Sequence, residues 1–282
     1  MQTIHSTAII ESGAIIGNNV TIEAYVIIKS TVTIEDNVII KSHVYIDGNT
    51  TIGQGTVIWP FASIGTKTQD KKFIGEKTFV YVGKNCEVRE FVTINSSCGE
   101  NSSVSIGNNC LIMAYCHVAH NCIIGSNVIM ANNVMLAGHV HIEDYVVIGG
   151  MTPIHQFVRI GKYAMVGGFS RVTHDIPPYT IGAGFEYEIR GLNLVGLKRH
   201  GIALDIRKKL NQVLSLIYTS DLTLAKSLEI IEETIEMDPY ITHFIDFCRN
   251  STRGLSGRKR QSSNELVNAS IDFKELVIPT SV

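Results

Sequence analysis

An isoleucine occupies every sixth position from residue 4 to residue 64 without a gap. A small or β-branched residue follows four positions after each one, as Val20 follows Ile16. A six-residue period fits neither an α-helix nor a simple strand, whose periods are 3.6 and 2. It does fit a short strand followed by a tight turn, repeated as the flat faces of a prism. With three faces per coil, residues 18 apart stack in neighbouring coils, about 4.8 Å apart. The sequence therefore predicts a mainly β protein, a parallel β-helix of hexapeptide repeats.

Solenoids of this class coil to the left, against the usual right-handed crossover, so we expect a left-handed parallel β-helix. The hand follows from the class, because the period alone does not give it. The flat faces would be rich in exposed Ile, Val and Thr, which predicts side-by-side packing into a symmetric oligomer.

The repeat is interrupted twice. Residues 66–78 carry no aliphatic at positions 70 and 76, and the phase resumes unchanged at Val82. Residues 95–103 place Glu100 at an aliphatic position, and the repeat resumes at Ile106. Both stretches are expected to be loops leaving a corner of the prism. Insertions of this kind often build a binding face, although a solvated loop without function is the simpler alternative.

The period becomes helical in the last third of the chain. We expect the β-helix within residues 1–190, with Pro177-Pro178 ending the rod, and a helical domain over residues 191–256. Asp238-Pro239 reads as a helix cap followed by proline at the first helical position. The tail, residues 257–282, has little period and is interpreted as a candidate disordered segment. Three apolar stripes support the helices: Ile206, Leu210, Val213, Leu214 and Ile217; Leu224, Leu228, Ile231 and Ile235; Ile241, Phe244, Ile245 and Cys248.

Composition narrows the functional classes. The 282 residues carry a formal charge of −2, and 18% of them are charged, so nothing predicts a nucleic-acid partner. No export signal is visible at the N-terminus, and no run of eighteen apolar residues predicts a transmembrane helix. Five of the six cysteines fall on the small-residue position of the repeat, which predicts buried thiols rather than disulfides or metal ligands and favours a reducing, cytoplasmic environment. They are Cys86, Cys98, Cys110, Cys116 and Cys122.

Histidines gather on one predicted edge. When their residue numbers are divided by 18, the length of one coil, His155, His120 and His139 leave remainders of 11, 12 and 13. They therefore occupy nearly the same position in three successive coils, near one corner of the prism. His117 lies on the same segment as His120. Such an edge suits either a zinc site or general-base catalysis. Since no carboxylate is near His120 in sequence, we expect a backbone carbonyl to orient its ring. Gly138 would offer a backbone N–H suited to an oxyanion.

The motifs on this edge closely resemble the acyl-[acyl-carrier-protein]–UDP-N-acetylglucosamine O-acyltransferases, which catalyse the first step of lipid A biosynthesis. The resemblance covers about residues 3–256. It rests on His117-Val118-Ala119-His120-Asn121-Cys122, Leu136-Ala137-Gly138-His139-Val140, Ile148 to Phe157, Gln69-Asp70-x-Lys72, Asp175-Ile176-Pro177-Pro178-Tyr179, Gly196-Leu197-Lys198-Arg199 and Ser251-Thr252-Arg253-Gly254.

The resemblance implies a homotrimer with active sites between neighbouring rods, no cofactor, and acyl carrier protein and UDP-N-acetylglucosamine as partners. It implies that His120 is the general base and that Gly138 binds the oxyanion. Asp70 and Lys72 would hold the sugar from the neighbouring subunit. Gly168 matches the position that limits acyl length. The other substrate-binding residues that it implies are Gln69, His117, His139, His155, Gln156, Asn193 and Arg199.

Three other interpretations stay open at this point. One is another hexapeptide acyltransferase, acting on a 3-amino sugar nucleotide or as an N-acyltransferase. The second is a zinc enzyme resembling the γ-class carbonic anhydrases, and the third is an inactive paralogue that serves as a scaffold. The chain departs from the pattern of many relatives at Ser96, Phe185, Val195 and His200, and the last two departures affect the expected nucleotide site.

Overall fold

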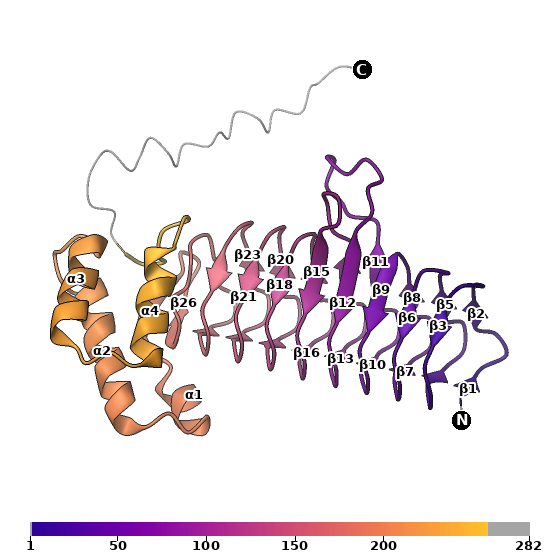
Figure 1. Ribbon diagram of the computed structural model, residues 1–282, viewed down its shortest axis with the longest axis horizontal. Helices are drawn as coiled ribbons and strands as arrows, with labels where there is room; N and C mark the ends of the chain where they lie inside the picture. Colours follow the sequence, from indigo (N-terminus) through magenta and orange to yellow (C-terminus); the bar gives the residue numbers. More distant parts are fainter. Residues whose placement is uncertain (1, 259–282) are drawn as a thin grey trace, which may run out of the picture.

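The computed structural model describes residues 2–258, so the expectation for the tail concerns residues that lie almost entirely outside the described part. The chain forms a long rod of short strands, with helices packed at the end opposite the N-terminus (Figure 1). The rod is a left-handed parallel β-helix, as the hexapeptide period and its class predict. None of the helices in residues 2–258 has the length and apolar character that a membrane crossing requires.

Three sheets run along the rod, one for each face of the prism. The first sheet contains β1 (Thr3–Ile4), β4 (Thr21–Ile22), β7 (Ile39–Ile40), β10 (Val57–Ile58), β13 (Glu87–Val88), β16 (Leu111–Ile112), β19 (Ile129–Met130), β22 (Val147–Ile148), β25 (Met165–Val166), β26 (Thr180–Ala183) and β27 (Glu188–Leu192). The second contains β2 (Ile9–Ile10), β5 (Ile27–Ile28), β8 (Tyr45–Ile46), β11 (Ser63–Thr66), β14 (Thr93–Asn95), β17 (His117–Val118), β20 (Met135–Leu136) and β23 (Pro153–Ile154). The third contains β3 (Ile15–Ile16), β6 (Thr33–Ile34), β9 (Asn49–Ile52), β12 (Phe79–Val82), β15 (Ser103–Ile106), β18 (Ile123–Ile124), β21 (His141–Ile142) and β24 (Arg159–Ile160).

The register follows the predicted coil length. Thr3 pairs with Thr21 and Ile129 pairs with Val147, each 18 residues on. The two insertions lengthen the spacing locally, so that Val57 pairs with Glu87 and Glu87 with Leu111. Downstream of both insertions the spacing of 18 returns, and the strands keep their faces.

Alternate side chains fill the interior of the rod. Ile28 and Val26 are fully buried, whereas Ile27 in the same strand is only partly buried. The first coil lacks a neighbour on one side, and Ile4 is 43% exposed there. The period of two within each strand and the turn between strands therefore produce the six-residue repeat.

The turns between faces place residues in the left-handed region, where asparagine is common. Asn37 has φ 59° and His139 has φ 61°. At the corner between the first and second sheets the turn residues are aromatic and stack as an exposed ladder, with ring centroids 4.9 to 5.0 Å apart; it consists of Tyr25, His43, Phe61, Phe91 and Tyr115. We name this edge the Phe91 corner.

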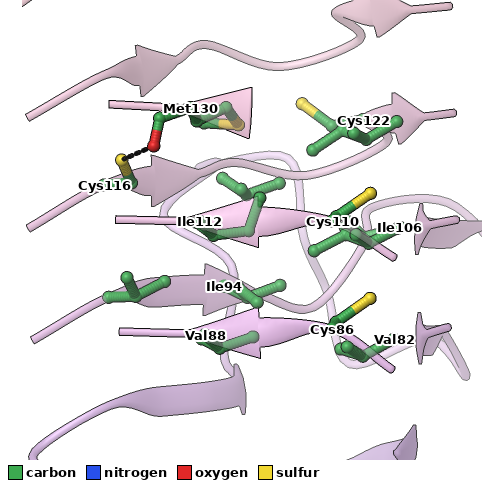
Figure 2. Packing of buried hydrophobic residues seen from close by; sticks show 14 of the residues in the cluster. Val82, Cys86, Val88, Ile94, Ile106, Cys110, Ile112, Cys116, Cys122 and Met130 are labelled. Carbon is green, nitrogen blue, oxygen red and sulfur yellow. Dashed lines mark hydrogen bonds between the residues drawn. The ribbon is translucent and has the colours of Figure 1, made fainter. Parts of the chain in front are cut away.

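Four of the five repeat-position cysteines are buried, as expected, and lie among aliphatic side chains of successive coils (Figure 2). The Cys116 Sγ contacts the Met130 carbonyl at 3.9 Å, and the Cys110 Sγ contacts the Gly125 carbonyl at 3.1 Å. The expectation was wrong for Cys98, which is only partly buried. The second insertion carries Cys98 out of the coil, between β14 and β15, although its number keeps the phase of the repeat.

The expectation that Pro177-Pro178 ends the rod was also wrong. β26 follows the two prolines and still pairs in parallel with β25, and β27 then folds back on it in antiparallel fashion. Both prolines precede the strand, so their missing N–H groups remove nothing from the ladder. This hairpin extends the first sheet by two strands toward the helices.

Four helices follow the hairpin: α1 (Leu194–Arg199), α2 (Leu204–Tyr218), α3 (Leu224–Thr234) and α4 (Pro239–Arg249). The three predicted stripes lie at their shared core, with Ile206 and Leu224 partly buried at its margin. Asp238 caps α4 through its carboxylate, which accepts hydrogen bonds from the Tyr240 and Ile241 N–H groups, and proline begins the helix.

The helices are attached to the rod by polar contacts as well as packing. The His243 Nε2 lies 2.9 Å from the Glu143 carboxylate, and its Nδ1 lies 2.9 Å from the Tyr179 hydroxyl. Burial raises the pKa of Glu143, but the hydrogen bond and charge of His243 outweigh burial and hold it below its usual value. The Arg159 guanidinium of β24 stacks on the Phe247 ring of α4. These contacts fix the helices against the last coils of the rod.

The burial pattern predicts a matched pair of stability variants in β5. Ile28→Ala should lower the free energy of unfolding by about 2–5 kcal/mol, because it opens a cavity in the interior. Ile27→Ala removes the same atoms from the partly buried face and should cost less than half as much. Urea unfolding monitored by circular dichroism tests this; equal losses for the two variants would contradict the alternation.

Candidate functional site

Both insertions leave the rod at the same corner. Residues 67–78 connect β11 to β12 and residues 96–102 connect β14 to β15, so each joins the second sheet to the third. The first insertion projects visibly from the side of the rod (Figure 1). Asn121, His139 and Phe157 are the left-handed turn residues of the same corner in the following coils. We name this edge the histidine corner.

The two insertions hold each other in place. The Glu76 carboxylate accepts a hydrogen bond from the Gly99 N–H at 2.7 Å. This bond and those from the backbone N–H groups of Glu76 and Ile74 lower the Glu76 pKa to about 2. Ser96 is one of the positions where the chain departs from the pattern of many relatives. Its hydroxyl accepts a hydrogen bond from the Thr68 N–H at 3.2 Å. Ser96 therefore anchors the first insertion, and that loop is positioned for a role at the corner.

His120 stands at the centre of the site. Its Nδ1 lies 2.9 Å from the Asn121 side-chain oxygen, and its Nε2 lies 3.6 Å from Asp70 Oδ2. The second distance is too long for a hydrogen bond, but it is short enough for an ion pair whenever the His120 ring carries a proton on both nitrogens. The imidazole covers Gly138, where an added Cβ would lie 2.3 Å from His120 Cε1. Within residues 2–258 the Gly138 N–H donates no hydrogen bond. The Nδ1 of His120 is thus held by Asn121. Its Nε2 faces the Asp70 carboxylate, close to the Gly138 backbone.

The orientation of Asn121 fixes the proton on His120. The Asn121 Nδ2 donates to the Cys98 carbonyl at 3.0 Å, and the Cys98 N–H donates to Asn121 Oδ1 at 3.3 Å. The same Oδ1 therefore faces His120 and can only accept, so the His120 Nδ1 must donate. The Nε2 then carries the lone pair of the neutral ring. The expectation that a backbone carbonyl orients His120 was wrong, because the amide side chain of Asn121 does so.

The neighbouring histidines surround this base. The His139 ring meets His120 edge-on at 5.2 Å and stacks on Phe157 at 4.6 Å. The His117 Nδ1 lies 2.7 Å from the Thr93 hydroxyl. Burial lowers the pKa of His117, and burial is also the main cause of the lowered pKa of His139, which the nearby Asp70 carboxylate opposes. Both rings are therefore neutral hydrogen-bonding groups at neutral pH.

His155 continues the corner one coil farther on and is exposed, as is Gln156. Its Nδ1 lies 3.2 Å from Arg253 Nη2 and 3.3 Å from the Gln156 carbonyl oxygen. The first insertion contributes Gln69, which is exposed, and Lys72, whose N–H donates to Asp70 Oδ1 at 2.9 Å. Asp70 lies beside His120 of its own chain. Its expected contact with a sugar bound by a neighbouring subunit stays a prediction.

Three predicted residues lie at other corners. Asn193 caps α1 through Gly196 and donates to the Tyr163 carbonyl, at the corner between the third and first sheets. Arg199 ends the same helix, where His200 packs edge-on against Tyr145. Gly168 is exposed at the Phe91 corner, beside Phe169. A single chain therefore does not bring these residues to the histidines. The departures Phe185 and Val195 are exposed.

Sequence reasoning missed two positioning residues, Asn121 and Thr93. Asn121 directly follows His120, but its partner at Cys98 is in an aperiodic loop that gives no signal. Thr93 could have been found, because it keeps the phase of the repeat and pairs with His117 across the ladder, 24 residues away, where the second insertion adds six residues to the 18-residue coil. In the described part of the chain no three His, Cys, Asp or Glu side chains are grouped so that they could hold a metal ion.

Comparisons with known proteins identify the family that the chain resembles. Residues 175–256 match the model of domain 2 of UDP-N-acetylglucosamine O-acyltransferase, and residues 31–66 and 103–138 match the bacterial transferase hexapeptide model. The chain is 56% identical over 256 residues to the acyl-[acyl-carrier-protein]–UDP-N-acetylglucosamine O-acyltransferase of Chlamydia abortus, covering 90% of this chain and 92% of the relative. The enzyme of the same name from Chlamydia trachomatis is 53% identical, covering 90% and 91%. A crystal structure of the UDP-N-acetylglucosamine acyltransferase from Bacteroides fragilis superposes with a TM-score of 0.88 at 37% identity, covering 90% and 99%.

The contact between Gly138 and the His120 ring generates a structural prediction. In Gly138→Ala the new methyl would overlap the imidazole, so the ring should rotate away and break its hydrogen bond to Asn121. A crystal structure of the variant tests this. Ala137→Gly, which changes the exposed neighbouring position, is the control. An unmoved His120 ring in Gly138→Ala would show that the corner backbone yields instead.

Proposed function

The chain belongs to the family of acyl-[acyl-carrier-protein]–UDP-N-acetylglucosamine O-acyltransferases, and we propose that it carries out the reaction in that name. A 3-hydroxyacyl chain passes from acyl carrier protein to the 3-hydroxyl of UDP-N-acetylglucosamine, the first step of lipid A biosynthesis. The observation that carries the proposal is the set of His120, Asp70 and Gly138 at one corner, within a chain of this family. Acyl transfer to a hydroxyl needs a base for its proton and a donor for the oxyanion, and this corner supplies both.

The reaction proceeds by direct attack. The His120 Nε2 accepts the proton of the sugar 3-hydroxyl while that oxygen forms a bond to the thioester carbon. The carbonyl electron pair moves onto oxygen, where the unused Gly138 N–H donates a hydrogen bond. The tetrahedral intermediate then collapses, the carbon–sulfur bond breaks, and the thiolate takes the proton from His120. The base is regenerated, and no acyl-enzyme forms.

The neighbours of His120 keep it in this role. Asn121 fixes the Nδ1–H, so the lone pair on Nε2 is the one that meets the substrate. The Asp70 carboxylate stabilises the imidazolium that forms after proton transfer, at the 3.6 Å distance described above. Because Asp70 is held by the loop that also carries Gln69 and Lys72, that loop couples sugar binding to the base. His117 and His139 are neutral and can donate to or accept from sugar hydroxyls. His155 and Gln156 extend the site toward the diphosphate.

The remaining predicted contacts support a homotrimer. Asn193 and Arg199 would bind the nucleotide, yet they lie at a different corner from His120. These two corners are separated by the length of one face, measured along a strand, which is on the order of 15 Å. A neighbouring rod that presents its helical end to the histidine corner would close the distance, and the exposed ladder at the Phe91 corner offers apolar surface for such packing. Light scattering of the purified protein tests this; a monomer that retains full activity would contradict it.

We also place the protein in the cytoplasm. All six cysteines are free thiols, and five of them are buried. Thiols of this kind persist in a reducing compartment, where acyl carrier protein would also be the acyl source.

The decisive assay follows acyl transfer from 3-hydroxyacyl carrier protein to UDP-N-acetylglucosamine or to its 3-amino analogue. We expect transfer to the hydroxyl acceptor, and about a 10²–10⁴-fold or greater loss in His120→Ala, because the base is removed. His5→Ala, at the exposed N-terminal end, should retain full rate. Circular dichroism establishes that both variants fold. Activity only with the amine would change the assigned acceptor, and undiminished turnover in His120→Ala would remove this histidine from the base role.

Gly168 carries the proposal for chain length. It is exposed at the Phe91 corner, where a neighbouring rod would form a groove with it, and an added Cβ there would already stand 3.1 Å from the Gly150 carbonyl oxygen. A methionine at this position would fill the groove. Gly168→Met should therefore reduce kcat/KM for long acyl chains about tenfold or more while sparing short ones. Competition between carrier proteins bearing chains of different length measures the ratio; an unchanged ratio would remove Gly168 from this role.

A further inference from the structure

The C-terminal segment, residues 251–256, returns from α4 to the last coil of the rod. Leu255 pairs in parallel with Asp175, the Asp175 N–H donates to the Gly254 carbonyl, and the Ser256 N–H donates to the Asp175 carbonyl. The Asp175 carboxylate is fully buried, and it accepts hydrogen bonds from the Arg159 N–H at 2.8 Å and the Ser251 hydroxyl at 2.7 Å. A buried carboxylate is retained only when its oxygens are satisfied in this way. The segment is therefore fixed in register with the last coil.

This register places Arg253 against the histidine corner. Its Nη2 donates to the Thr173 carbonyl at 2.9 Å and contacts His155 Nδ1 at 3.2 Å. Its Nε is buried and finds no acceptor among residues 2–258. The motif Ser251-Thr252-Arg253-Gly254 has no role in the reaction proposed above, although Arg253 contacts His155 of the candidate site.

The contact determines which nitrogen of His155 carries the proton. A guanidinium can only donate, so the His155 Nδ1 must accept and the proton of the neutral ring lies on Nε2. The Gln156 carbonyl oxygen, 3.3 Å from the same Nδ1, would require the opposite tautomer. The two contacts exclude each other, and the charged donor is the stronger partner. Arg253 thereby makes the Nε2 of His155 a hydrogen-bond donor.

We propose that Arg253 is a positioning residue that holds His155 in its Nε2–H tautomer, so that this nitrogen donates to a phosphate oxygen of the nucleotide sugar. The inference rests on the proposed function, in which His155 contacts the diphosphate. Without Arg253 the ring is free to donate through Nδ1 to the Gln156 carbonyl. The Nε2 would then present a lone pair to an anion, which repels it. The helical end of the chain thus controls the polarity of a side chain on the rod.

The test compares Arg253→Met, Arg253→Lys and the control Thr252→Ala, which changes an exposed residue of the same segment. We expect Arg253→Met to raise KM for UDP-N-acetylglucosamine about tenfold or more, with kcat and the KM for acyl carrier protein nearly unchanged. Arg253→Lys keeps a charged donor and should recover part of the loss. Thr252→Ala should behave as the native protein. Thermal unfolding of each variant shows that the segment remains folded.

A double-mutant cycle separates positioning from a direct contact. If Arg253 acts through His155, adding Arg253→Met to His155→Ala should weaken nucleotide binding by less than about twofold beyond His155→Ala alone. Full additivity, or an unchanged KM in Arg253→Met, would overturn the proposal. So would a rise confined to the KM of acyl carrier protein, which would point to the phosphate of its prosthetic group. If the native protein shows no acyl transfer, the proposed function fails, but calorimetric binding of UDP to the same variants still decides the role of Arg253.

Discussion

The hydrogen bonds between successive coils are the constraint from which the rest of the structure follows. Each coil donates backbone hydrogen bonds to the next coil and accepts them from the previous one. The Thr21 N–H donates to the Val38 carbonyl, and the Val20 carbonyl accepts a hydrogen bond from the Thr3 N–H. This ladder allows no slip, because a shift of one residue would turn every buried aliphatic outward. The packed interior and the ladder therefore enforce the same register. Residues far apart in sequence share a corner only because that register holds along the whole rod.

The hexapeptide period made much of this fold predictable. It gave the three faces, the coil length and the two interruptions, because each aliphatic position reports burial directly. It failed where the chain leaves the coil while its numbering stays in phase, as at Cys98. It also failed at Pro177-Pro178, since a proline before a strand removes no ladder hydrogen bond. The period reports the interior of the rod and carries little information on what is attached outside it.

The candidate site divides along the same line. The coil spacing brought His120, His139 and His155 to one edge, and the rings of the first two are in contact. The groups that determine which ring nitrogen of His120 and His155 carries the proton could not be predicted from the coil spacing. Asn121 is oriented by an aperiodic loop, and Arg253 lies about 100 residues farther along the chain than His155. The resemblance to a family named candidate residues for this site in advance. It did not show that Asp70 meets His120 within one subunit, nor that Asn193 and Arg199 stay away from them.

The two ends of the rod differ in a way that bears on its mechanical behaviour. The C-terminal coils are covered by a hairpin, four helices and the returning segment, whereas β1, β2 and β3 at the other end each have one strand partner. Ile9 and Ile15 in that first coil are 57% and 63% exposed. In a solenoid the stability of each coil comes largely from its neighbours, so a coil with one neighbour is held least firmly. Fraying should therefore start at the N-terminal coil and progress one coil at a time, while the corner that carries His120 melts only after several layers have been lost.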